Sequence, residues 1–239
     1  MTSVVRWVEV HRLAVAGREA GIAREVGGRV GGVWLARSRF ADVARLAGLT
    51  LTLGEDAGAF YQLGWAGHVT GDRTAALAAY DQALRLYRAA GDRAGEAATL
   101  SNIGGVYEGL GERQRALEYL GQALPITREV GDRAAEAGTL TNIGAVYHGL
   151  GEPQRALEYC GQSLPITREV GDRAGEAVTR YNVAMIHRAR GELDRAVAEL
   201  EQVVELDRQV GHPDLQSDTE MLDRVRQELA SSDPGHGPR

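Results

Sequence analysis

The sequence contains no lysine, and all 27 of its basic residues other than histidine are arginine. A P-loop needs a lysine to hold its phosphates, and a protein kinase needs one to position its nucleotide. Schiff-base chemistry needs the lysine amine itself. These three kinds of active site are therefore excluded within this chain.

Cysteine, aromatic residues and long apolar runs are also scarce. The single cysteine, Cys160, cannot form an internal disulfide, which is typical of a reducing compartment, so we expect a cytoplasmic protein. No apolar run approaches the length of a membrane-spanning helix, and residues 1–17 lack the uninterrupted apolar core of a signal peptide. The sequence therefore predicts no membrane partner.

Positive charge is not gathered anywhere in the chain. The formal net charge is −6, and the arginines are spread among aspartate and glutamate. Binding to a phosphate backbone needs clustered basic residues, so we expect no nucleic-acid partner.

What the chain does have is an internal repeat. Residues 91–130 and 131–170 align without a gap and are identical at 32 of 40 positions. Residues 51–90 and 171–210 continue the same register more loosely. The predicted organisation is a degenerate repeat region at 1–50, four repeats at 51–210, a capping helix at 211–230 and a disordered tail at 231–239.

Each repeat has the pattern of two helices. Gly91 ends an apolar-periodic stretch, as a glycine after a helix often does, and Asp92 is a good N-cap for the next helix. Leu100, Ile103 and Tyr107 then fall on one helical stripe. The prediction is an all-α fold, an α-solenoid of tandem helix–turn–helix repeats with a C-terminal capping helix, about ten to twelve helices and no β-sheet.

The motif inside the repeat resembles the tetratricopeptide repeat (TPR). Leu100-x2-Ile103-Gly104-x2-Tyr107 is followed by Ala116, and the same spacing recurs in the other three repeats. The usual unit has about 34 residues. The longer units here are similar to those of kinesin light chain and of arrays attached to bacterial signalling ATPases.

This resemblance implies a protein–protein interaction adaptor that binds an extended peptide or a partner protein in a concave groove. It implies no enzyme, and we expect no catalytic, cofactor-binding or metal-binding residues. The alternative is a regulatory or sensor array belonging to a larger bacterial signalling ATPase or transcriptional regulator system. The apolar residues Val4, Val5, Trp7 and Val8 favour that alternative, because they predict a surface that continues into another structure.

One polar position recurs on the first helix of each repeat. The residues at this position are Gln62, Asn102, Asn142 and Asn182. Asparagine is a poor helix former, so its recurrence is explained either by inheritance through duplication or by a ladder that binds a peptide backbone. The predicted peptide-binding site adds apolar residues at the two ends of this ladder, namely Tyr61, Trp65, Tyr181 and Met185.

Several other groups have plainer interpretations. Cys160 occupies a core position, and Tyr107 and Tyr147 are predicted to fill the core within their repeats. The glycines of segment 27–32 are expected to mark a turn between helices. Glu136, Glu176 and the Arg-Glu pairs beginning at residues 128 and 168 are expected to be solvated surface charge.

Overall fold

The computed structural model describes residues 3–35 and 37–232, and throughout these ranges the secondary structure is α-helical, without strands. The all-α prediction is confirmed. The helices are α1 (Ser3–Ala16), α2 (Ala20–Leu35), α3 (Phe40–Leu51), α4 (Ala57–Val69), α5 (Arg73–Ala90), α6 (Arg93–Gly109), α7 (Arg113–Val130), α8 (Arg133–Gly149), α9 (Pro153–Val170), α10 (Arg173–Ala189), α11 (Leu193–Val210) and α12 (Leu215–Ser232). The cap helix α12 includes Ser231 and Ser232, and the rest of the expected disordered tail, 233–239, lies outside the described residues.

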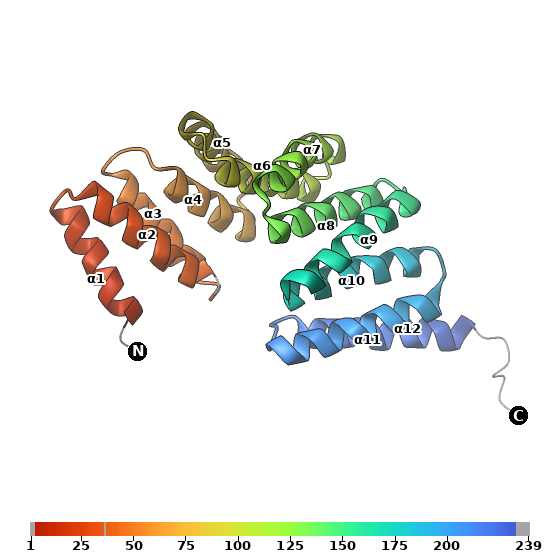
Figure 1. Ribbon diagram of the computed structural model, residues 1–239. Helices are drawn as coiled ribbons and strands as arrows, with labels where there is room; N and C mark the ends of the chain where they lie inside the picture. Colours follow the sequence, from red (N-terminus) through yellow and green to blue (C-terminus); the bar gives the residue numbers. More distant parts are fainter. Residues whose placement is uncertain (1–2, 36, 233–239) are drawn as a thin grey trace, which may run out of the picture. The chain divides into compact units, whose positions relative to one another are not determined.

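The chain divides into two compact units, residues 1–123 and residues 124–239, with the boundary inside α7. In each unit, consecutive helices pack as antiparallel pairs joined by short turns (Figure 1). The pairs α4–α5, α8–α9 and α10–α11 correspond to predicted repeats. Within its unit, the first helix of one pair also contacts the first helix of the next, as α8 contacts α10.

The same local signals begin and end the repeat helices. The side chain of an aspartate accepts a hydrogen bond from the backbone N–H three residues later, which caps the start of α5, α6, α8 and α10. Gly171 ends α9 with φ of +71°, a left-handed conformation that favours glycine. These caps explain why the helix boundaries follow the repeat so closely.

In the first unit, the apolar residues of α1 divide between two environments. Val4 and Val8 pack against a buried cluster contributed by α2 and α3. Val5 and Trp7 remain exposed, at 66% and 40% of their surface. The guanidinium of Arg29 on α2 lies over the Trp7 ring, 5.7 Å from its centroid, so Val5 is the most exposed residue of this apolar segment.

The core of the second unit depends on a close approach between α8 and α9. Gly144 faces Cys160, and a Cβ at residue 144 would lie 2.6 Å from the cysteine sulfur. Cys160 is fully buried, and burial raises the pKa of its thiol to about 12, which fits a structural thiol rather than a nucleophile. Tyr147 is buried and stacks on Tyr159 with ring centroids 5.4 Å apart, as its predicted core position requires.

The glycine-rich segment 27–32 does not form the expected turn. It lies inside α2, which is helical without interruption from Ala20 to Leu35. The side chain of Gln62 on α4 fills the space over Gly31, where any Cβ would collide with the Gln62 amide. Close packing between α2 and α4 is the physical reason for glycine at that position.

Candidate functional site

The predicted ladder position on α8 lies on an open face of the second unit. Asn142 is exposed, and Gly138, one turn earlier on the same face, has only open space where a Cβ would be. Ala145, one turn later, is small and half-buried. The neighbouring helix α10 contributes Asn182, which is half-buried. The second unit therefore presents two ladder amides on adjacent first helices.

A buried polar network lies beneath this face. The hydroxyl of Thr141 is 2.8 Å from that of Ser163 on α9 and 2.8 Å from that of Thr179 on α10. Ser163 in turn donates to the carbonyl of Ala137 at 2.9 Å. Because these hydrogen bonds join α8, α9 and α10, they hold the two first helices in a defined spacing.

In the first unit, the ladder amides are used by the fold. Gln62 is only 8% exposed, and its Nε2 donates to the carbonyl of Gly28 at 3.3 Å. Asn102 on α6 donates from Nδ2 to the hydroxyl of Tyr61 on α4 at 2.9 Å. Because these two amides already donate hydrogen bonds to neighbouring helices, each has fewer donors left for a ligand.

The aromatic and apolar residues of the predicted site are also partly committed to packing. Tyr61 packs edge-on against Trp65 and Tyr80, with centroid distances of 6.2 and 5.8 Å. Burial raises the pKa of Tyr61, whereas Trp65 remains 38% exposed. Tyr181 and Met185 pack at the edge of the core formed by α10, α11 and α12 and are half-buried. The structure thus brings Tyr61, Trp65 and Asn102 together in the first unit.

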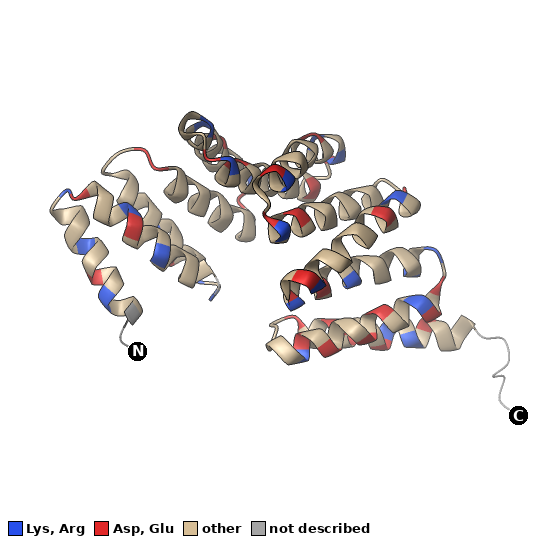
Figure 2. Ribbon diagram, in the orientation of Figure 1, with Lys and Arg blue, Asp and Glu red and all other residues tan. Residues whose placement is uncertain are grey.

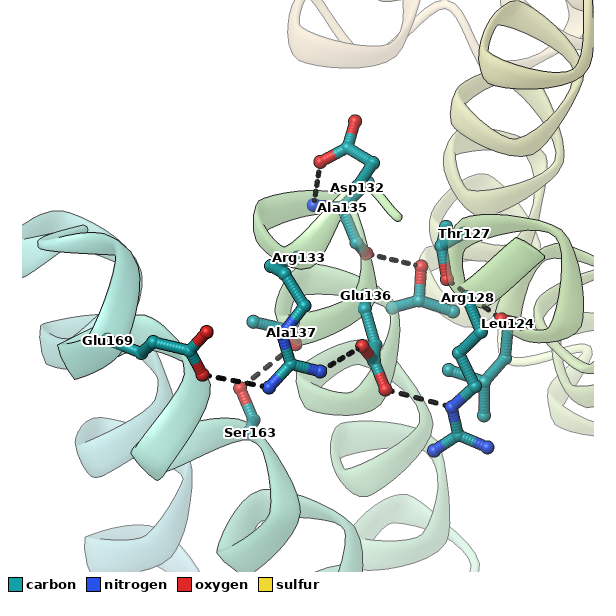
Figure 3. Close-up of polar contacts among 11 residues, drawn as sticks. Leu124, Thr127, Arg128, Asp132, Arg133, Ala135, Glu136, Ala137, Ser163 and Glu169 are labelled. Atoms are coloured by element: carbon teal, nitrogen blue, oxygen red, sulfur yellow. Dashed lines mark hydrogen bonds and ion pairs between the residues drawn. The ribbon is translucent and has the colours of Figure 1, made fainter. Parts of the chain in front are cut away.

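Sequence reasoning missed a buried ion pair, shown in Figure 3. Glu136 at the start of α8 is 6% exposed rather than solvated, so the expectation of a surface charge was wrong. Arg128 at the end of α7 donates from Nε to Glu136 at 2.8 Å, and Arg133 donates from Nη1 at 2.5 Å. Arg133 also reaches Glu169 on α9 at 2.9 Å. The contact joins the end of one repeat to the beginning of the next.

The same contact recurs in the neighbouring repeats, and we call it the Arg–Glu clasp. Arg88 pairs with Glu96 at 2.8 Å, and Arg168 pairs with Glu176 at 2.9 Å, always eight residues apart. Burial by itself raises the pKa of each glutamate, but hydrogen bonds from two arginines outweigh burial and hold the pKa below its ordinary value. The signal available in the sequence was this spacing of arginine and glutamate, which recurs with the period of the repeat.

Charge elsewhere is interleaved along the helices of both units (Figure 2). Among residues 3–35 and 37–232, the structure has no group of three or more His, Cys, Asp or Glu side chains arranged to hold a metal ion. None of the described helices is both long enough and apolar enough to cross a membrane.

The helix pairs and their motif find a direct match among known families. The model of a tetratricopeptide repeat family matches residues 57–129 and 135–209, more than half of the chain. The chain belongs to the tetratricopeptide repeat family. This TPR assignment supports a role in protein interaction, and the family is generally a non-enzymatic scaffold. No curated protein matches the chain in sequence.

Solved TPR-like structures resemble this chain in fold at low sequence identity. A Rap protein complexed with competence and sporulation factor has 15% identity and a TM-score of 0.72, covering 86% of this chain and 65% of that chain. The apo quorum sensor NprR from B. thuringiensis has 17% identity and a TM-score of 0.73, covering 95% and 66%. A putative kinesin light chain from Podospora anserina has 15% identity and a TM-score of 0.59, covering 78% and 95%. This chain spans just under two thirds of the length of the Rap and NprR chains.

Proposed function

We propose that this TPR chain is an adaptor that binds an extended peptide, free or within a partner protein, along the face formed by the first helices of its second unit. The observation that carries the proposal is the open stripe on α8, where exposed Asn142 stands between Gly138 and Ala145. Fold similarity to a Rap protein that was solved with competence and sporulation factor supports the proposal.

The chemistry of the stripe suits a peptide backbone. A primary amide offers a donor and an acceptor side by side, which matches one peptide unit without contacting its side chain. Helices in contact lie about 8–10 Å apart, which is about three residues of extended chain. Asn142 on α8 and Asn182 on α10 would therefore hold peptide units about three residues apart, with Met185 available as an apolar contact.

Gln62 and Asn102 have a different part in this proposal. Their amides hold α2 to α4 and α4 to α6 through Gly28 and Tyr61. We infer that they shape the first-helix face of their own unit, on which Trp65 remains an exposed apolar side chain.

The test begins with selection of a binding peptide from a displayed random library, followed by calorimetry on variants. Each neutral hydrogen bond contributes about 0.5–1.5 kcal/mol, so replacing Asn142 and Asn182 together with Ala should weaken binding by about 1–3 kcal/mol. Circular dichroism should remain unchanged, because Asn142 is exposed and Asn182 is half-buried.

The matched control is Asn102→Ala. Its amide bonds to Tyr61, so we expect it to lower the free energy of unfolding by about 0.5–1.5 kcal/mol and to affect peptide affinity less than the double variant does. Unchanged affinity in the double variant, or an equal loss in Asn102→Ala, would contradict the ladder in the second unit.

A second candidate function is a sensor array of a signalling ATPase or transcriptional regulator. It is favoured by apolar side chains left exposed on α1 and α2, notably Val5, Leu13 and Ile22 at 66%, 54% and 48%. If the gene neighbours an ATPase gene, the two purified proteins should co-elute in size-exclusion chromatography. Replacing Leu13 and Ile22 with Ser should abolish this co-elution without lowering the affinity for the library-selected peptide.

A further inference from the structure

A pocket in the second unit combines acidic side chains with a buried carboxylate. It lies among the first half of α10, the end of α11 and the beginning of α12, and its volume is about 350 Å³. Asp207, Asp214 and Asp218 supply its acidic side, and Val178 and Tyr181 of α10 supply its apolar side. Nothing in the proposed peptide ladder accounts for these three carboxyl groups.

Asp207 is the unusual member of this group. It is 1% exposed, lines the pocket, and its Oδ2 is buried without any hydrogen-bond donor. A buried carboxylate without a donor is costly, so such a group in a folded protein calls for a specific explanation. A ligand that brings donors into the pocket is one such explanation.

Comparison with the earlier repeats shows that the repeat itself does not require Asp207. The equivalent residues of the two preceding repeats are Thr167 and Thr127, which are buried and donate to Leu164 and Leu124 at 2.9 and 2.8 Å. Threonine thus satisfies this position inside the helix, whereas Asp207, which lines the pocket, leaves its buried Oδ2 without a hydrogen-bond partner. Asp218 also differs from the residue one repeat period earlier, which is Val178, 40 residues before it.

Several basic side chains around the pocket already have polar partners. His212 lies 3.9 Å from Asp207 and 3.8 Å from Asp214 through Nδ1, and this nitrogen accepts a hydrogen bond from the backbone N–H of Asp214 at 3.3 Å. Three arginines of α10 and α11 are bonded elsewhere, Arg173 to Gln209, Arg180 to Glu176 and Glu199, and Arg208 to Glu205.

The neighbouring acidic groups also raise the pKa of Asp218. Burial, a hydrogen bond to Asp207 and the negative charges of Asp207 and Asp214 raise the pKa of Asp218 to about 6. Like charges so close together favour a cation between them.

We propose that this pocket binds the guanidinium group of an arginine side chain from the bound peptide. A guanidinium presents several donors in a plane, which suits the adjacent carboxyl groups of Asp207 and Asp218, and it stacks on aromatic rings such as that of Tyr181. Half-exposed Val178 offers apolar surface to the stem of the arginine.

The position of the pocket connects it to the peptide ladder. Val178 lies one helical turn before Asn182, so the two residues share a face of α10. In this respect the inference rests on the proposed function, because the peptide supplies the arginine. It adds a specificity, namely a preference for peptides with a basic residue near the position held by Asn182.

The pocket is tested separately from the ladder with Nα-acetyl-arginine amide as the probe, titrated into the full chain and followed by amide NMR shifts. The wild-type protein should show saturable shifts at Tyr181, Asp207 and Asp218. Nα-acetyl-citrulline amide has nearly the same shape without the charge and should give no saturable shift. Nα-acetyl-lysine amide should bind more weakly than the arginine probe.

Variants identify the group responsible. Asp207→Thr introduces the residue found at Thr127 and Thr167, so the fold is expected to accept it, and it should weaken arginine binding at least tenfold. Asp207→Asn provides the same test with nearly unchanged shape if the threonine variant does not fold. The control Asp194→Thr removes the same charge from another position of α11, at its first turn, and should change binding less than twofold.

Three results would overturn the inference: no saturable binding of the arginine probe, equal binding of citrulline, or unchanged binding in a folded Asp207 variant. Because the probe has no extended backbone, these results leave the peptide ladder unaffected. Conversely, if the Asn142 and Asn182 variants bind peptide normally while Asp207→Thr loses the arginine probe, the ladder fails and the pocket remains.

Discussion

Glu136 illustrates how a single side chain joins two repeats. It lies in the first turn of α8, where a negative charge is favoured by the helix dipole, and it accepts hydrogen bonds from Arg128 of the preceding helix and from Arg133 of its own. The carboxylate is buried while both arginines remain nearly half exposed. The ion pair is thus satisfied on its buried side and hydrated on its exposed side, which avoids most of the cost of burying two charges.

We therefore expect Glu136→Gln to lower the free energy of unfolding by about 1.5–2 kcal/mol, the lower part of the range for hydrogen bonds to charged groups, because the arginines are partly solvated. Urea denaturation followed by circular dichroism measures the change. Glu158→Gln removes the same charge from α9 at a position without a recurring arginine partner, and it should stay within about 0.5 kcal/mol of the wild type. An equal effect of the two substitutions would contradict the role assigned to Glu136.

At the scale of the helix pair, a small residue on the first helix sets the distance to the second. Gly64 faces Tyr80, Gly104 faces Leu120 and Gly144 faces Cys160, each too close for an added Cβ. The fourth repeat has Ala184 in the same place, with Leu200 opposite, and both are fully buried. The glycine in the motif is therefore explained by packing between helices rather than by backbone conformation.

Gly144→Ala should destabilise the chain by about 1–3 kcal/mol through overpacking. The added methyl group would lie 2.6 Å from the sulfur of Cys160 and 3.2 Å from the carbonyl of Ala156, so the two helices would have to separate. Thermal unfolding measures the loss. Removing the sulfur by Cys160→Ala in the same chain should recover part of the lost stability. Additive losses of stability in the double variant would show that the two residues do not interact.

At the scale of the whole molecule, the Arg–Glu clasp repeats in three places along the chain. Glu96, Glu136 and Glu176 each have a pKa held below the ordinary value of 4.5. A carboxyl group with a lowered pKa in the folded state stabilises the fold above the unfolded-state pKa and loses this contribution as the pH falls below it. Asp218 acts in the opposite direction, since its pKa is raised to about 6.

The free energy of unfolding should therefore rise slightly as the pH is lowered through about 6 and fall steeply below about 4.5. Urea denaturation at a series of pH values measures this profile. Replacing Glu96, Glu136 and Glu176 together with Gln should flatten the part of the profile below 4.5. A profile that stays steep in the triple variant would contradict the assignment.

The amino-acid sequence alone determined the repeat, the capped helix starts within the clear repeats and the family of this protein. Those features depend on local chemistry, such as Asp132 capping the helix that follows it, or on a spacing that recurs with the period of the repeat. Other features were decided only by tertiary structure, because they depend on side chains from different helices. Gln62 and Asn142 hold equivalent positions, yet Gln62 fills the space over Gly31 while Asn142 stands open. In the sequence, Asp207 is one acidic residue among many. Only the packing of α10, α11 and α12 shows that it lines a pocket and that its Oδ2 is buried without a hydrogen-bond partner.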